Sequence, residues 1–385
     1  MVYLALALGI VFSAYWVAQL EFVRRHRRWS FARLSSDASD AGAPVSVVHP
    51  IKDVDYGLEE NLEGWFAQDY RGRVEHIFSF QDPDDPAIAV VRQAVARHPE
   101  QAVRIIVNPL APGVTGKSSN MAHGLAAAAS DYVVFTDSDI RVRPDFLVKM
   151  VRPLREAKVG ATTCGQMNVG GRDFPTRFFT FMQNCETIFN WAFLTRLGVD
   201  VGLTGAVFGM RRAVIEEVGG LARLGDSLLE DMFLGNMLVA RGYRLVLGPF
   251  VECHVDRLPL ERSINYARRL AIGITHHISL EMPAILLMLC WYWLLGAVGL
   301  AARDMRLAAT AAAFLGVRSI HGLVQRVLTG NRILAIDVLM APLFDLVGTV
   351  SLLASFGLRR VTWRGITYEL ERNGRIKSVT RTVRN

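Results

Sequence analysis

The chain has 385 residues, of which 51% are hydrophobic and 21% charged, and its formal net charge at pH 7 is +7. A mean hydropathy of +0.25 is high for a soluble enzyme, and the apolar residues are clustered in segments rather than spread along the chain. Basic residues flank these apolar segments, which favours an anionic membrane surface over nucleic acid as their partner. The four cysteines have no CxxC spacing and predict neither a zinc site nor a disulfide framework.

The first apolar segment, Val2 to Val23, is long enough to span a membrane as a helix and is almost uncharged until Glu21. The basic cluster Arg24 to Arg28 follows it, whereas a signal peptide carries its charge before the apolar run. We therefore predict an uncleaved transmembrane anchor over 1–23, with the cluster in the cytoplasm. A basic juxtamembrane segment and linker would occupy 24–44.

Residues 45–256 have a globular composition in which strand-like and helix-like runs alternate. The predicted strands are Val45 to Pro50, Arg73 to Phe80, Val103 to Val107 and Asp131 to Thr136, and the predicted helices are Leu58 to Gln68, Ala87 to Arg97 and Met121 to Ala129. This alternation indicates an α/β domain with a Rossmann-like, mostly parallel sheet.

Two aspartates one residue apart, Asp137 and Asp139, follow the last of these strands. Open α/β sheets bind their ligands at the carboxyl ends of the strands. Two carboxylates there suit Mg²⁺ or Mn²⁺, and such an ion can hold a diphosphate. A plain turn or helix cap is the alternative interpretation of Asp-Ser-Asp.

Acidic and basic residues at other predicted termini extend this hypothesis. Asp82 and the Asp84-Asp85 pair follow the second strand, where they can contact a nucleotide's base or ribose or form a solvated turn. Lys117 lies in the loop Gly113 to Asn120, which is not a P-loop because Pro112 stands where that motif needs glycine. At a helix N-terminus this lysine can meet a phosphate, or it is an ordinary surface lysine.

Two pairs of charged residues in the second half of the chain are also candidates. Glu230 and Asp231 begin an apolar stretch, either as partners of the helix dipole or with one of them as a general base. Arg268 and Arg269 lie in an amphipathic segment over 257–277, where arginines commonly snorkel at the membrane interface. The functional alternative is a cation that neutralises a diphosphate leaving group.

Taken in order, these blocks resemble a membrane-anchored GT-A glycosyltransferase, specifically the ceramide glucosyltransferase family. The resemblance runs from about Val45 to Arg269, with a weaker echo at Trp363-Arg364-Gly365. The blocks that carry it are Pro50-Ile51-Lys52-Asp53-Val54-Asp55 with Asn61-Leu62-Glu63, Gln81-Asp82-Pro83-Asp84-Asp85-Pro86-Ala87, Asp137-Ser138-Asp139-Ile140-Arg141-Val142 with Pro144-Asp145, Thr204-Gly205 with Met210-Arg211, and Glu230-Asp231.

The resemblance implies an inverting transfer of a hexose such as glucose from a UDP-sugar to the hydroxyl of ceramide, giving a β-glycosylceramide. Asp231 would be the general base, Arg268 would stabilise the departing diphosphate, and Glu230 would stand beside the base. Asp139, helped by Asp137, would coordinate Mg²⁺ or Mn²⁺ on the diphosphate. The implied donor-binding residues are Lys52, Asp82, Lys117, Asp137, Asp139 and Arg269.

The chain departs from the family pattern at the final motif. The family has Gln or Arg, two variable residues, then Arg-Trp; here Asn265 and Arg269 take the outer places and only Arg268 is kept. Some members lack the second carboxylate of the Asp-x-Asp, and this chain has both, which favours metal dependence.

The C-terminal third predicts membrane helices over 278–358 and a basic tail over 359–385. Ile278 to Ala302 and Ile333 to Leu358 are long enough to span, whereas polar residues interrupt Leu307 to Val327. We expect this last segment to be re-entrant or interfacial, which keeps the C-terminus in the cytoplasm together with the catalytic domain. Phe174 to Phe193, rich in aromatic residues, is either an interfacial helix on the bilayer or a buried core helix.

Three other functions share parts of this pattern. Another lipid acceptor, such as diacylglycerol, a hopanoid or a polyprenyl phosphate, would leave the same motifs. A processive polysaccharide synthase shares the aspartates but normally keeps the tryptophan that is missing after Arg268. A non-catalytic membrane scaffold would not need the intact Asp-x-Asp or the Glu230-Asp231 pair.

Overall fold

The computed structural model describes residues 2–33, 42–109, 115–199, 202–221, 227, 229–277, 282–355, 358–363, 366–371 and 375–381. The chain divides into two compact units. The sheet unit comprises His26–Asn168 and Trp191–Val255, and the helical unit comprises Met1–Arg25, Val169–Asn190 and Asp256–Asn385. The predicted catalytic domain 45–256 thus corresponds mainly to the sheet unit, but Val169–Asn190 groups with the helices.

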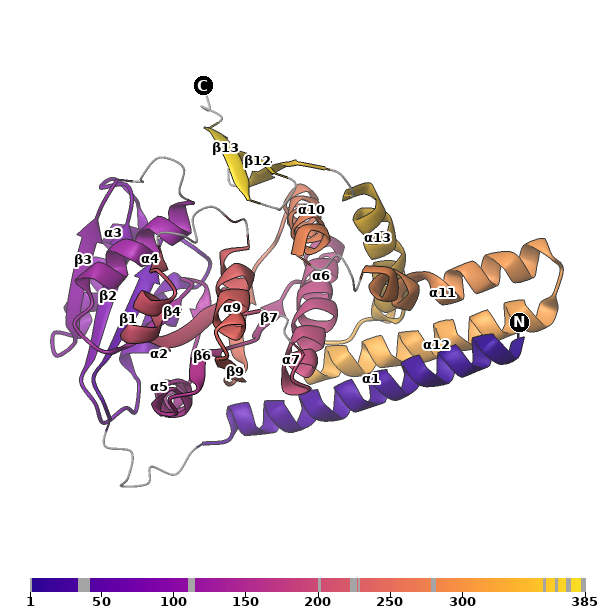
Figure 1. The fold of residues 1–385 in the computed structure, drawn as a ribbon, viewed down its shortest axis with the longest axis horizontal. Coiled ribbons are helices and arrows are strands. Elements are labelled where there is room, and N and C mark those ends of the chain that lie inside the picture. Colours follow the sequence, from indigo (N-terminus) through magenta and orange to yellow (C-terminus); the bar gives the residue numbers. More distant parts are fainter. Residues whose placement is uncertain are drawn as a thin grey trace. The chain divides into compact units, whose positions relative to one another are not determined.

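A seven-stranded sheet with the strand order β3-β2-β1-β4-β8-β6-β9 is the centre of the sheet unit (Figure 1). Its strands are β1 (Val45–Pro50), β2 (Val74–Phe80), β3 (Ala102–Val107), β4 (Tyr132–Thr136), β6 (Val159–Thr163), β8 (Val207–Arg211) and β9 (Arg244–Leu247). All neighbouring pairs are parallel except those that β8 makes with β4 and β6. The predicted mostly parallel sheet is confirmed, and the four predicted strands are β1 to β4.

The register of the sheet gathers the segments that follow its parallel strands at one edge. Phe80 at the end of β2 lies opposite Val107 at the end of β3. Because β8 is antiparallel, its first residue Val207 lies opposite Thr136, the last residue of β4. The residues just before β8 therefore share this edge with the Asp-x-Asp that follows β4.

The three helices predicted in this unit are present as α2 (Leu58–Phe66), α3 (Ala87–Arg97) and α4 (Gly116–Ala127), the last with a shifted start. The unit also contains α5 (Phe146–Val151), η1 (Arg152–Arg155), most of α7 (Phe189–Arg196), α8 (Arg212–Glu217) and α9 (Glu230–Ala240). The predicted start of α4 at Met121 is wrong by five residues, because the Thr115 side chain accepts a hydrogen bond from Ser118 N and caps the helix earlier. Lys117 consequently lies in the first turn of this helix.

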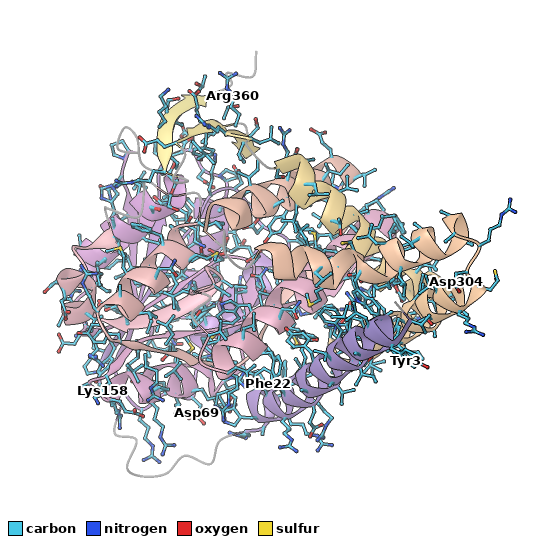
Figure 2. All side chains as sticks on the ribbon, turned by 45° about the vertical axis from the view of Figure 1, so that its right-hand side comes forward. Tyr3, Phe22, Asp69, Lys158, Asp304 and Arg360 are labelled. Carbon is cyan, nitrogen blue, oxygen red and sulfur yellow. The ribbon has the colours of Figure 1, made fainter. Side chains whose placement is uncertain are left out.

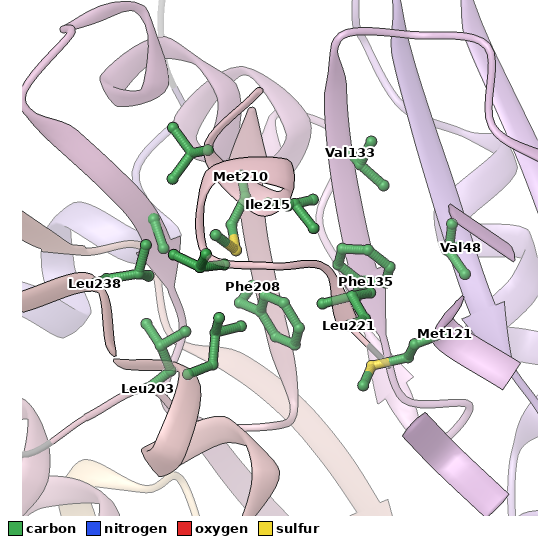
Figure 3. Close-up of a cluster of buried hydrophobic side chains, with 14 of the residues drawn as sticks. Val48, Met121, Val133, Phe135, Leu203, Phe208, Met210, Ile215, Leu221 and Leu238 are labelled. Atoms are coloured by element: carbon green, nitrogen blue, oxygen red, sulfur yellow. The ribbon is translucent and has the colours of Figure 1, made fainter. Parts of the chain in front are cut away.

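Apolar side chains from strands and helices far apart in sequence form the core around the sheet. In the cluster of Figure 3 the rings of Phe135 on β4 and Phe208 on β8 stack with centroids 5.0 Å apart. Val48 and Val133 are fully buried in the same cluster, and Leu238 of α9 packs there. Burial of this kind contributes about 25 cal/mol per Å² of apolar surface and holds the strand ends in place.

A second, three-stranded sheet of order β5-β10-β7 lies beside the Asp-x-Asp. Its strands are β5 (Ile140–Arg141), β10 (Val251–Val255) and β7 (Gln166–Gly170). Ile140, the residue after Asp139, pairs with Cys253 of β10. This pairing brings a residue from the end of the sheet unit to the second aspartate.

The anchor helix α1 (Val2–Phe31) extends through the basic cluster, so the helix is longer than the predicted span. Lys149 caps its end: the buried ammonium donates to the carbonyls of Ser30 at 2.9 Å and Ala32 at 2.8 Å. An ion pair with Asp145 at 2.9 Å completes the site. A cation at a helix C-terminus satisfies carbonyls that have no partner within the helix.

The helical unit holds the remaining helices and a small sheet. Its elements besides α1 are α6 (Phe174–Phe181), η2 (Met182–Ile188, a π-helix), α10 (Leu260–His277), α11 (Met282–Ala301), α12 (Met305–Leu328), η4 (Ala335–Leu339), α13 (Met340–Ser355), β11 (Arg360–Trp363), β12 (Ile366–Leu370) and β13 (Ile376–Arg381). Among the described residues three helices, Val2–Phe31, Met305–Leu328 and Ala335–Ser355, are long and apolar enough to cross a membrane, and Leu286–Ala301 is apolar but shorter. Outward-facing residues of α1 such as Tyr3 are strongly exposed (Figure 2).

The polar residues that interrupt the predicted segment 307–327 are buried and paired. Arg318 of α12 forms a bidentate ion pair with Asp345 of α13 at 2.7 and 2.8 Å. Tyr292 of α11 donates to the same carboxylate at 2.5 Å, and His321 lies 3.1 Å from Gln19 of α1. Charged groups in spanning helices are tolerated when they face one another inside a bundle, so α12 meets the requirement for a span despite them.

The aromatic segment 174–193 is largely a core element of the helical unit. Phe181 is 1% exposed, and the buried Arg177 forms an ion pair with Asp337 of η4. Phe174 at the start of the segment is 44% exposed. The buried ion pair of Arg177 is consistent with the grouping of this segment, up to Asn190, with the helices.

The predicted basic tail 359–385 contains an antiparallel sheet of β11, β12 and β13. Val361, Tyr368 and Leu370 are buried, so one face of the sheet is apolar although the segment as a whole is basic. Trp363 pairs with Ile366 in this sheet, while Arg364 and Gly365 of the weaker family echo lie outside the described residues.

Candidate active site

The Asp-x-Asp lies at the sheet edge that the sequence predicted. Asp137 follows β4 directly, and its backbone N–H donates to the carbonyl of Ala206 at 2.9 Å. This bond ties the first aspartate to the segment before β8. The position of Asp137 is therefore set by the end of β4 and by the residue before β8.

Lys117 is brought to this edge by the first turn of α4. Its Nζ lies 2.5 Å from Asp137 Oδ1 and donates to the carbonyl of Gly205 at 2.7 Å. Burial alone lowers the pKa of the Lys117 ammonium, but the nearby carboxylates of Asp137, Glu230 and Asp231 outweigh it, so the pKa is raised. Lys117 is thus a paired cation within the site rather than a free surface lysine.

Asp231 reaches the same point from the first turn of α9. A Cβ placed on Gly205 would lie 2.8 Å from Asp231 Oδ2 and 3.2 Å from Lys117 Nζ. Asp231 and Lys117 therefore both lie against Gly205, and a side chain there would intrude on both. Asp231 Oδ1 also accepts a bond from Met232 N at 2.9 Å, while the neighbouring Glu230 is buried.

The Asp139 carboxylate is buried beside other carboxylates, and one of its oxygens has no hydrogen-bond donor. Burial, the Asp137 carboxylate and the Asp55 carboxylate raise its pKa from 3.8 to about 6. Its Oδ1 is buried without a hydrogen-bond partner, while Oδ2 accepts from Cys253 Sγ at 3.4 Å. A buried carboxylate oxygen with no donor beside it is an acceptor to which a cation can bind.

These carboxylates fit a divalent ion that also binds a ligand's oxygens. Among the described residues no three His, Cys, Asp or Glu side chains are arranged as a complete metal site. Mg²⁺ in nucleotide enzymes is commonly held by one or two carboxylates plus phosphate oxygens and water, which two aspartates satisfy. Asp137 and Asp139 are the residues that would hold such an ion.

Two residues of the site were not assigned a role from the sequence. Asp55, in the loop after β1, accepts from Ser138 Oγ at 2.5 Å, and so a third acid stands beside the Asp-x-Asp. Cys253 contacts Asp139 through the β5–β10 pairing described above. Asp55 could have been found from the sequence, because it is an acid in the loop that follows the predicted strand Val45 to Pro50. No sequence pattern near Cys253 pointed to the site.

The remaining candidates of the sheet unit lie nearer its surface. Asp82 and Lys52 are exposed, and Asp82 Oδ1 accepts from Asp84 N at 2.9 Å within its own turn. Asp85 is buried and accepts from Asp53 N at 3.0 Å, so it joins two loops of the edge. Asp85 is thus a buried link between loops and not part of a solvated turn, while a donor contact of Asp82 and Lys52 stays a prediction.

Arg268 and Arg269 lie on α10, in the helical unit. Arg268 is exposed and Arg269 is half-buried. Their predicted contacts with a diphosphate therefore stay predictions.

Comparison with known proteins identifies the family of the chain. A model of glycosyl transferase family 21 matches residues 2–376. Ceramide glucosyltransferase 1 of Caenorhabditis elegans is 29% identical over 210 residues, which are 53% of this chain and 43% of that protein. Ceramide glucosyltransferase 3 of the same organism is 24% identical over 295 residues, 68% of this chain and 62% of that protein. The chain thus spans less than two thirds of these relatives, and the predicted family resemblance is confirmed.

A solved structure with the same fold covers nearly the whole chain. It is the mannosyltransferase PcManGT from Pyrobaculum calidifontis in complex with GDP-Man and Mn²⁺, at 19% identity and a TM-score of 0.53. The match covers 91% of this chain and 97% of the other. At this identity the likeness concerns the fold, and it confirms the predicted GT-A class.

Proposed function

Since the chain belongs to glycosyl transferase family 21 and is a glycosyltransferase, we propose that it transfers glucose from UDP-glucose to the hydroxyl of ceramide with inversion. The observation that carries this proposal is that Lys117, which pairs with Asp137, and Asp231 meet at Gly205, with the buried Asp139 carboxylate beside Asp137. The relatives named ceramide glucosyltransferase support the sugar and the acceptor. The product would be a β-glucosylceramide in the membrane.

The acceptor half of the reaction is assigned to Asp231. An alcohol is too weak an acid to ionise at neutral pH, so a carboxylate has to accept its proton as the new C–O bond forms. Asp231 would take this proton while the hydroxyl oxygen attacks the anomeric carbon on the face opposite the leaving UDP. Glu230 would hold the start of α9, and Gly205 leaves room for the hydroxyl beside the base.

The donor half is assigned to the two aspartates and the cations. Asp137 and Asp139 would hold Mg²⁺ or Mn²⁺, which neutralises charge on the diphosphate. PcManGT, the protein of like fold, has Mn²⁺ and GDP-Man bound, which supports a divalent ion and a nucleotide sugar here. Arg268 would add a second positive charge to the leaving group, and Asp82 with Lys52 would contact the nucleoside side.

Membrane attachment supports a lipid acceptor. The three helices able to cross a membrane support insertion in a bilayer, and Arg24 to Arg28 at the end of the anchor would put the catalytic domain on the cytoplasmic side. In a bacterium this would be the inner membrane. An acceptor hydroxyl at headgroup level is then available without leaving the bilayer.

The test is a substrate matrix on the purified full-length protein in lipid nanodiscs. UDP-glucose, UDP-galactose, UDP-glucuronate and GDP-mannose are each offered with ceramide, diacylglycerol or a polyprenyl phosphate, and products are identified by mass. We expect hexosylceramide from UDP-glucose, with a β-linkage by NMR and no product from Asp231→Asn. Product from another lipid but none from ceramide would show that the proposed acceptor is wrong. An α-linked product would contradict inversion.

A further inference from the structure

Lys117 contacts both halves of the candidate site. On the donor side its Nζ is 2.5 Å from Asp137 Oδ1. On the other side it is held by the Gly205 carbonyl at 2.7 Å, next to the Asp231 carboxylate. The Lys117 ammonium thus neutralises Asp137, which is assigned to the metal. It also lies next to Asp231, which is assigned to the acceptor.

We propose that Lys117 competes with the divalent cation for Asp137 and leaves this carboxylate only when the diphosphate of the donor binds. The inference rests on the proposed function and adds to it an order of binding. The cation alone would bind weakly, and the cation and the nucleotide would strengthen each other's binding. An enzyme of this kind would not hold its metal firmly between turnovers.

The reason for competition is the distance between the two cations. Mg²⁺ and Mn²⁺ bind carboxylate oxygens at about 2.1 Å, so an ion on Asp137 would stand within a few ångströms of the Lys117 ammonium. Like charges this close, in a partly buried site, repel strongly. Asp139 keeps a buried oxygen without a partner, so a cation has a ligand waiting there once Asp137 is released.

The diphosphate provides the anion that relieves this repulsion. Lys117 is the second residue of α4, where the N–H groups of the first turn and the helix dipole favour a phosphate. An ammonium moving from Asp137 to a phosphate oxygen keeps a charge-assisted hydrogen bond throughout. Its aliphatic chain can swing without moving the helix.

Two simpler roles for Lys117 predict different metal binding. A lysine that only binds phosphate would leave Mn²⁺ affinity unchanged when it is replaced and no nucleotide is present. A lysine that only supports Asp137 structurally would, when replaced, leave the aspartate misplaced and Mn²⁺ binding weaker. Competition alone predicts tighter Mn²⁺ binding without nucleotide.

The experiment measures Mn²⁺ binding to the full-length protein in nanodiscs, by the EPR signal of free Mn²⁺, with and without UDP. Lys117→Met should bind Mn²⁺ about tenfold more tightly than wild type without UDP, since it removes a nearby like charge. Lys117→Arg, which keeps the charge, should bind no more tightly than wild type. Lys158→Met is the matched control: Lys158 is an exposed lysine of the same unit (Figure 2), and its loss should not change the affinity.

The effect of UDP provides a second test that needs no variant. UDP should strengthen Mn²⁺ binding to wild type, and by a larger factor than it does for Lys117→Met. Unchanged or weaker Mn²⁺ binding by a folded Lys117→Met would overturn the competition, as would Mn²⁺ and UDP binding independently to wild type. Failure of wild type to bind Mn²⁺ even with UDP would overturn the metal in the proposed function as well.

Discussion

Replacing Gly205 with alanine is expected to lower turnover roughly tenfold while leaving the sheet unit folded, because a misplacement of about 1 Å at a reacting group costs about 100-fold and the base has to move by about half of that. The added Cβ would stand 2.8 Å from Asp231 Oδ2 and 3.2 Å from Lys117 Nζ. Ordinary contact distances begin at about 3.4 Å, so the Asp231 oxygen has to retreat by about 0.6 Å and the Lys117 nitrogen by about 0.2 Å. They are the ends of side chains, and they can retreat without displacing a strand.

Stability and chemistry should therefore separate in this variant. Small-to-large changes in well-packed sites cost about 1–3 kcal/mol, and flexible neighbours place Gly205→Ala at the low end of this range. The assay compares kcat and KM for sugar transfer with the midpoint of thermal unfolding. Gly316→Ala is the control, since a Cβ there meets nothing within 4 Å.

Retention of more than half of the wild-type kcat in Gly205→Ala would refute the proposal that the base Asp231 and the cation Lys117 act side by side at Gly205. A loss of activity that merely follows a loss of folded protein would refute it too. A raised KM for the acceptor with an unchanged kcat would indicate that Gly205 contributes to binding of the lipid and not to the chemical step.

Three further outcomes are expected. Asp231→Asn should bind UDP-sugar but transfer the sugar at least about 100-fold more slowly, and the loss of turnover in Glu230→Gln should be smaller. If Asp231→Asn keeps more than about a tenth of wild-type turnover, Glu230 becomes the candidate base. Arg268→Ala should lower kcat about 100-fold and Arg269→Ala less, in steady-state assays; small, equal effects would indicate two interfacial arginines. Burial lowers the pKa of His76 to about 3, so the neutral ring favours the folded state above pH 6.5, and this stability is lost as the pH falls from 6.5 toward 3. Between pH 6.5 and 5 the loss is about 2 kcal/mol at 1.36 kcal/mol per unit, to be seen in denaturant titrations as a pH dependence that His76→Gln reduces.

The local pattern of the chain determined four of the seven strands of the sheet and the position of the acids that follow them. The β-branched runs at Val45–Pro50 and Tyr132–Thr136 predicted strands, and both are strands of the sheet. The Asp-x-Asp after the second run was predicted at the carboxyl edge, because parallel strands end together. Even the start of α4 was wrong only by five residues, through a threonine cap that the Gly-rich loop obscured.

Tertiary structure decided which of these acids meet a partner. Lys117 and Gly205 are 88 residues apart in the chain, and they meet because β8 runs antiparallel to β4 and begins at the edge where α4 starts. Cys253 reaches Asp139 through a two-residue strand pairing that no periodicity reveals. Likewise, Arg318 helped to make α12 resemble a poor span, since composition counts its charge without showing that Asp345 of α13 neutralises it. Local sequence specifies an element through its propensity and its apolar face, whereas contacts between side chains depend on the packing of elements that are distant along the chain.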